Sequence, residues 1–151
     1  PQSINGIQPI SASINTEPGM NGVYTRALEH SEVIEMIKSF TDAAMRCKKA
    51  GFDGVELHGA HSYLICQFLG AITNRRDDEW GGDLESRSKF LIEIIKSIRK
   101  ETGPDFLIAV RISPIIEKIK SVCGVGRRWF FSTLFPRPTP NKPPLPKLSR
   151  A

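Results

Sequence analysis

One stretch of the sequence, GFDGVELHGAHSYLICQFL from Gly51 to Leu69, constrains the fold more than any other. In its first half the apolar Val55 and Leu57 alternate with polar residues, which is the two-residue period of a β-strand. Imidazole and phenol groups then follow within a few positions of the strand end. Such a concentration is typical of the carboxyl-terminal rim of an α/β barrel strand, because catalytic groups gather there on a rigid scaffold.

The groups at this strand end are His58, His61 and Tyr63. An imidazole exchanges protons near neutral pH, and a phenol can act as a general acid. The residues alone leave other interpretations open. Two histidines three positions apart can bind a metal ion or satisfy buried carbonyls, and Tyr63 can be a half-buried core aromatic. These three residues are the candidate site that the rest of the sequence has to support.

A helix and a strand are predicted around this stretch. Between Ser31 and Ala50, apolar residues recur at three- and four-residue spacing, which predicts an amphipathic helix. We expect Ser31 to cap its start and Gly51 to take the left-handed position after its end. The strand from Asp53 to His58 follows within a few residues, as in a repeating helix and strand unit. Residues 1 to 30, rich in Ser, Asn, Gly and Pro, are expected to form an irregular loop.

The same order of elements is predicted a second time. After the polar loop TNRRDDEWGGD, Asp83 is placed to cap a helix that begins at Leu84 and ends near Gly103. The run from Phe106 to Ile112 is apolar except for Arg111, which indicates a buried strand with a guanidinium near its exit. In the loop, Asp78 and Glu79 are expected to form structural ion pairs or caps. The sequence therefore predicts an α/β fold with two strands of the parallel type.

Three sequence blocks together resemble one family: GFDGVELHGAHSYLICQFL, TNRRDDEWGGDLESRSKFLIEII and FLIAVRIS. Over Pro9 to Pro114 the chain is similar to the old yellow enzyme family of FMN-dependent ene reductases, the NADH:flavin oxidoreductases. The resemblance implies a (β/α)8 TIM barrel, of which residues 1–114 would supply about strands 4 and 5 with their helices. PISASI, from Pro9 to Ile14, resembles the extended segment that follows the third barrel strand.

The resemblance also implies roles for four residues. His58 and His61 would donate hydrogen bonds to the carbonyl oxygen of an α,β-unsaturated carbonyl substrate, and Tyr63 would deliver a proton to its Cα. Arg111 would lie against the polar edge of FMN, with NADPH or NADH as the reductant. For Arg111 an alternative stays open, because it can simply pair with Glu56.

Residues 115–151 differ in character from the rest. They carry eight Lys and Arg against one Glu, and six prolines fall between Pro136 and Pro146. Such a segment cannot build a packed core and favours disorder or polyproline II. We predict a boundary after residue 114 and an unmatched, disordered tail. The net charge of +5 comes from this tail and says little about residues 1–114. Nucleic-acid binding through the RRWFF cluster of the tail is the least favoured function.

Composition limits where the protein acts. No run of eighteen apolar residues and no charged-then-apolar leader pattern occurs in the sequence. Cys47, Cys66 and Cys123 are an odd number at wide spacing, which indicates reduced thiols rather than disulfides or a zinc site. We therefore expect a cytoplasmic protein without a membrane partner.

The sequence also predicts what this chain does by itself. Because the resemblance covers about two strands of a barrel, we expect a truncated ene reductase with weak FMN binding and little activity. Self-association that supplies the rest of the site is a further possibility. The alternative function is a non-catalytic fragment or pseudoenzyme that acts through partner binding.

Overall fold

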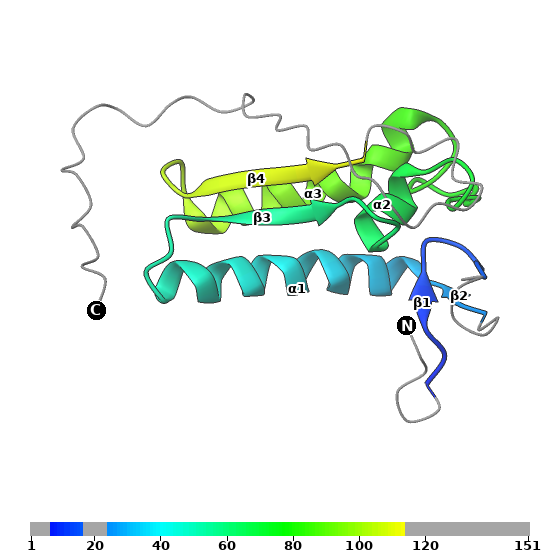
Figure 1. Ribbon diagram of the computed structural model, residues 1–151, viewed down its shortest axis with the longest axis horizontal. Coiled ribbons are helices and arrows are strands. Elements are labelled where there is room, and N and C mark those ends of the chain that lie inside the picture. Colours follow the sequence, from blue (N-terminus) through cyan, green and yellow to red (C-terminus); the bar gives the residue numbers. More distant parts are fainter. Residues whose placement is uncertain (1–6, 17–23, 114–151) are drawn as a thin grey trace, which may run out of the picture.

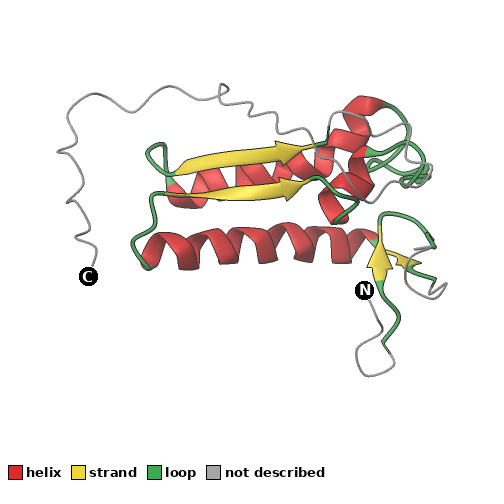
Figure 2. Cartoon of the chain, in the orientation of Figure 1, coloured by secondary structure: helices red, strands yellow, loops and turns green. Residues whose placement is uncertain are grey.

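The computed structural model describes residues 7–16 and 24–113, so the predicted tail at 115–151 and Cys123 lie outside the described residues. Figures 1 and 2 show a pair of long strands with helices beside it and a second pair of very short strands near one end. In chain order the elements are β1 (Ile10–Ser11), β2 (Arg26–Ala27), α1 (His30–Lys49), β3 (Gly54–Gly59), α2 (Leu64–Leu69), α3 (Leu84–Thr102) and β4 (Leu107–Ile112).

Strands β3 and β4 form the parallel pair that the sequence predicts. Their register runs from Gly54 opposite Leu107 to Gly59 opposite Ile112, so both strands start and end at the same level. Since alternate residues of a strand point to opposite faces, Leu57 and its neighbour Val110 share one face with Val55 and the buried Ile108. The other face carries the polar residues of both strands. That face also carries Ala109 and the exposed Leu107, so the sheet is apolar on one side and mixed on the other.

The apolar core lies between the sheet and the helices. Phe90 of α3 is fully buried; its ring stacks on Phe68 of α2 at a centroid distance of 4.3 Å and meets Phe40 of α1 edge-on at 6.3 Å. Leu57 and Ile108 belong to the same cluster of buried residues. The helix faces predicted from the three- and four-residue spacing are thus the faces that pack.

The predicted N-cap of α1, Ser31, was wrong by two positions. The helix begins at His30 with Glu29 as its N-cap, because the Glu32 carboxylate accepts a hydrogen bond of 2.9 Å from the Glu29 backbone N–H. Glu29 and Glu32 thus form a capping box, and this box performs the capping role that was expected of Ser31. At the other end the prediction is confirmed, because Gly51 has a φ of 88°, in the left-handed region. The cap predicted for α3 is confirmed as well, since Asp83 accepts from the Ser86 N–H at 2.8 Å.

The carboxylate of Glu32 should make stability depend on acid. Both terminal nitrogens of Arg26 donate to it at 2.6 Å, and together with the Glu29 N–H they lower the pKa of Glu32 from 4.5 to about 2. A group whose pKa is lower in the folded than in the unfolded state stabilises the fold above its unfolded pKa, and this stabilisation is lost as the pH falls toward the folded value. We expect Glu32→Gln to lower the melting temperature at about pH 6 and much less at about pH 2, where the stabilisation is mostly lost. Circular dichroism melts check this, with the exposed Glu35→Gln on the same helix as control; an equal effect at both pH values would contradict it.

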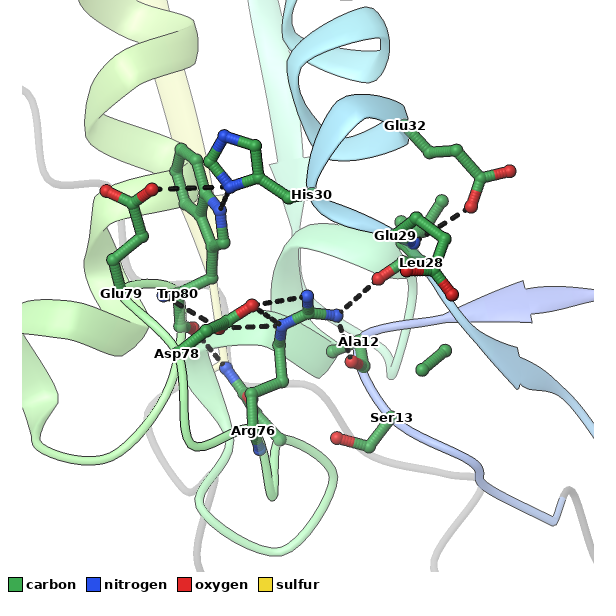
Figure 3. Close-up of polar contacts among 12 residues, drawn as sticks. Ala12, Ser13, Leu28, Glu29, His30, Glu32, Arg76, Asp78, Glu79 and Trp80 are labelled. Carbon is green, nitrogen blue, oxygen red and sulfur yellow. Dashed lines mark hydrogen bonds and ion pairs between the residues drawn. The ribbon is translucent and has the colours of Figure 1, made fainter.

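The described residues before α1, 7–16 and 24–29, contain more regular structure than expected. Residues 1 to 30 were predicted to be an irregular loop, but β1 and β2 pair in parallel, with Ile10 opposite Arg26. Arg76, in the loop before α3, donates to the carbonyls of Ala12 at 3.0 Å and Leu28 at 2.6 Å, as Figure 3 shows. One guanidinium therefore fixes this segment to the loop.

Ion pairs and hydrogen bonds of its side chains hold the polar loop before α3 in place. Asp78 pairs with Arg76 at 2.6 Å, and this ion pair lowers the pKa of Asp78. Glu79 pairs with Lys89 and lies 3.3 Å from His30 Nδ1, which also accepts from the buried Trp80 indole at 3.1 Å (Figure 3). The structural roles expected for Asp78 and Glu79 are confirmed.

No helix within residues 7–16 and 24–113 is long and apolar enough to cross a membrane.

Candidate active site

The structure brings His58, His61 and Tyr63 together at the carboxyl end of β3. The ring of His58 lies 5.1 Å from that of His61 and 5.0 Å from that of Tyr63, centroid to centroid. Tyr63 is 61% exposed, so it is not the core aromatic that the residues alone allowed. Two imidazoles and a phenol thus meet on an accessible edge of the sheet.

A tight turn makes this meeting possible. The Tyr63 N–H donates to the Ala60 carbonyl at 3.2 Å, and the two central residues, His61 and Ser62, have φ of 55° and 60°. Positive φ at both central positions defines a turn of the type I′ class, which glycine and asparagine favour. Neither residue here is one of these. The turn folds His61 back toward His58, and the cost of two left-handed side-chain-bearing residues is carried by the surrounding contacts.

The strain in this turn gives a direct prediction. Glycine adopts positive φ without the steric penalty of a Cβ, so Ser62→Gly should raise the free energy of unfolding by about 1 kcal/mol. Urea denaturation followed by circular dichroism measures the change. Ser39→Gly is the matched control: it makes the same substitution at an exposed position inside α1, where φ is negative, and should lower stability. A destabilised Ser62→Gly protein would show that the turn is not strained.

Arg111 lies at the same end of the sheet. It is opposite His58 in the β3–β4 register, and its guanidinium pairs with the Glu56 carboxylate at 2.7 Å. The alternative pairing that the sequence left open for Arg111 is therefore observed. The two side chains remain 41% and 39% exposed, so the pair lies on the open face of the sheet. Ser113, just after β4, accepts the His61 backbone N–H at 3.2 Å and joins the two strand ends.

The described cysteines, Cys47 and Cys66, pack within the fold and are not part of the candidate site. Burial raises the pKa of the Cys66 thiol, and Cys47 packs against the core, as expected for structural cysteines. Within the part of the chain that the structure describes, no group of three or more His, Cys, Asp or Glu residues is arranged to hold a metal ion.

Sequence reasoning did not identify two residues that support the turn, Gln67 and Ser11. The short helix α2 places Gln67 so that its amide donates to the Ser62 carbonyl at 2.7 Å, and Ser11 of β1 donates to the other end of that amide at 2.8 Å. The available signal was weak: Gln67 is the one polar side chain other than the cysteine in LICQFL. Nothing in the pattern pointed to Ser11.

Together these features define a class of protein: an α/β segment of the barrel type with acid–base groups at the carboxyl ends of parallel strands. Residues 5–124 match the sequence profile of the NADH:flavin oxidoreductase / NADH oxidase family, and the chain belongs to this family. The resemblance drawn from the three sequence blocks is confirmed, and the family match runs ten residues beyond the limit expected at residue 114. The relatives are oxidoreductases.

Two relatives show how the similarity is distributed. The chain is 45% identical over 113 residues to an NADH oxidase of Thermoanaerobacter brockii, which covers 75% of this chain and 17% of the relative. It is 39% identical over 120 residues to the putative 12-oxophytodienoate reductase-like protein 1 of Arabidopsis thaliana, covering 78% and 37%. The chain thus spans well under half the length of these relatives.

Solved structures agree with the sequence comparison. Morphinone reductase is 33% identical with a TM-score of 0.66, covering 73% of this chain and 33% of that one. The old yellow enzyme homologue from Zymomonas mobilis is 36% identical with a TM-score of 0.66, covering 72% and 33%. These neighbours are TIM-barrel proteins, and this chain has the fold of part of such a barrel.

Proposed function

We propose that this chain carries the carbonyl-binding and proton-donating part of an FMN-dependent ene reductase, which reduces the C=C bond of α,β-unsaturated carbonyl compounds with NADPH or NADH. One observation carries the proposal: the His58 ring lies within 5.1 Å of two further acid–base side chains at a strand exit. Residues 1–114 would correspond to about strands 4 and 5 of the barrel, with residues 115–151 as a separate tail.

The two histidines are the groups that would bind the substrate oxygen. Hydride addition to the β-carbon of an enone moves negative charge to its carbonyl oxygen, and fixed N–H donors stabilise that charge. The rings of His58 and His61 are inclined at 68° to each other, so they do not stack face to face and both can turn an N–H toward a common acceptor. They would hold the carbonyl and polarise the double bond.

Tyr63 is the group that would supply the proton. Its side chain is exposed and its ring lies 5.0 Å from that of His58, one of the two histidines proposed to bind the substrate oxygen. A phenol can protonate the substrate Cα as negative charge builds there, which completes the addition of hydride and proton across the double bond. Tyr63 would thus act as a general acid.

Arg111 is the residue that would contact FMN. When bound, FMN supplies the hydride. The fit rests on an observed feature: a half-exposed guanidinium at the end of β4, with one terminal nitrogen engaged by Glu56. The remaining N–H groups can donate to a polar, electron-rich ring edge. Consistent with the few barrel strands present, we propose that FMN binding by this chain alone is weak.

The first test is binding of an enone to the histidines. The chain contains three histidines, and His30, at the start of α1, accepts the Trp80 indole N–H, so it serves as an internal reference. In NMR spectra, 2-cyclohexen-1-one should shift the imidazole signals of His58 and His61 and leave that of His30 in place. Cyclohexanol, which lacks the carbonyl, is the control ligand. Equal shifts with cyclohexanol, or equal shifts at His30, would contradict the assignment.

The second test concerns the cofactor and the acid. A titration of FMN followed by its fluorescence should show no saturable binding at tens of micromolar if affinity is weak as proposed. Saturable one-to-one binding would contradict that part. In that case NADPH oxidation with FMN and the enone should occur and be slowed by Tyr63→Phe; an unchanged rate in the Phe variant would remove Tyr63 from the mechanism.

A further inference from the structure

We propose that Gln67 and Ser11 are positioning residues for this site: they hold the strained turn at His61 and Ser62 and so keep the His61 ring against that of His58. The inference rests on the proposed function for its catalytic meaning. Gln67 lies on α2 and Ser11 on β1, outside the strand end and turn that carry His58 and His61.

The contacts form a short relay. Gln67 Nε2 donates to the Ser62 carbonyl at 2.7 Å, and Ser11 Oγ donates to Gln67 Oε1 at 2.8 Å. Asn15 Nδ2 donates to Ser11 Oγ at 2.8 Å and to the Thr73 carbonyl at 2.9 Å. Ser11 is fully buried. The relay therefore runs from the segment before α1, through α2, to the turn that carries His61.

The relay also fixes which way the amide points. Because Asn15 donates to Ser11 Oγ, the hydroxyl proton of Ser11 is free to be directed at Gln67. That proton needs an acceptor, so the oxygen of the Gln67 amide faces Ser11 and its NH₂ group faces Ser62. The donor that the turn needs is thus set by residues more than fifty positions away in sequence.

The turn needs this donor because its own residues disfavour it. His61 and Ser62 have positive φ, where side chains clash with their own backbone, and the turn closes through one backbone hydrogen bond of 3.2 Å. The Gln67 amide holds the Ser62 carbonyl in the orientation that the left-handed conformation gives it. Without the donor, the turn relaxes toward negative φ and the His61 ring moves away from His58.

The test uses Gln67→Glu in the full chain. Glutamate keeps the size and the oxygen that faces Ser11, but at neutral pH it has no N–H for the Ser62 carbonyl. The readout is the nuclear Overhauser effect between the rings of His58 and His61, measured without FMN or enone. We expect this signal to be lost in Gln67→Glu, while the His30 signals stay unchanged.

Rescue separates positioning from simple destabilisation. In the double variant Gln67→Glu with Ser62→Gly, glycine takes positive φ without help, so the signal between the rings should return. Val33→Ala, in the core face of α1, lowers stability elsewhere and should leave the signal intact. If Gln67→Glu does not fold, Ser11→Ala is expected to give the same loss of signal.

Three results would overturn the inference: a signal retained in Gln67→Glu, a signal lost in Val33→Ala as well, or no return in the double variant. Because no ligand is present, these outcomes do not depend on the proposed function. An intact ring-to-ring signal without any response to 2-cyclohexen-1-one would instead contradict the proposed function alone.

Discussion

Replacing Phe90 by alanine is expected to lower the free energy of unfolding by about 3–5 kcal/mol. Phe90 is fully buried where three helices meet, stacked on Phe68 and edge-on to Phe40. The change removes the transfer free energy of the ring and leaves a cavity that its neighbours fill only in part. Against a typical stability of about 5–15 kcal/mol, this loss leaves a large unfolded fraction under mild denaturing conditions.

Urea denaturation monitored by circular dichroism measures the effect of Phe90→Ala. Phe52→Ala is a matched control, because the same substitution falls at a side chain that is 63% exposed, in the turn between α1 and β3. The control should lose well under the Phe90 value. Similar losses for both variants would show that the stack of Phe90 and Phe68 is not the centre of the core.

Replacing Arg76 by methionine should release the segment before α1. The guanidinium binds two backbone carbonyls, of Ala12 and Leu28, and the Asp78 carboxylate, and its side chain is only 10% exposed. Methionine fills similar space but donates nothing, so the two carbonyls lose this donor, while the Asp78 carboxylate keeps the Trp80 backbone N–H at 3.1 Å. We expect a loss of about 3 kcal/mol, because groups left unpaired when a charged hydrogen-bonded partner is removed are costly.

The location of this loss is as informative as its size. Hydrogen exchange should speed up at the Arg26 and Leu28 amides, which bind the carbonyls of Pro9 and Ser11 across the β1–β2 pair. Amides of β3 and β4 should keep their protection. Arg46→Met, at an exposed arginine of α1, removes the same charge and should change neither. Uniform acceleration through the sheet would mean that Arg76 stabilises the whole fold and not this segment.

The regular part of the fold was predictable because its signals are local. The spacing of apolar residues in α1 and α3, and the caps at Gly51 and Asp83, are each set by neighbours along the chain. The start of α1 was missed because two carboxylates, Glu29 and Glu32, displaced the expected serine. The β1–β2 pair was missed because two-residue strands have no period; a guanidinium far away in sequence holds them in place.

The candidate site divides in the same way. The proximity of His58, His61 and Tyr63 was expected from their spacing at a strand end. The turn that joins them was not, since His61 and Ser62 carry none of the glycine or asparagine that marks positive φ. Its support from Gln67 and Ser11 is a tertiary contact, and no pattern within either segment predicts it.

Strands β3 and β4 end at the same level, and this affects how such a scaffold can change during evolution. The Phe90 stack lies among the helices, whereas the groups proposed for chemistry lie at or just beyond the last residues of each strand. Substitutions at the strand exits can therefore change the chemistry without touching the apolar face that packs against the helices. The exception is the turn after β3, where new chemistry must remain compatible with a left-handed backbone.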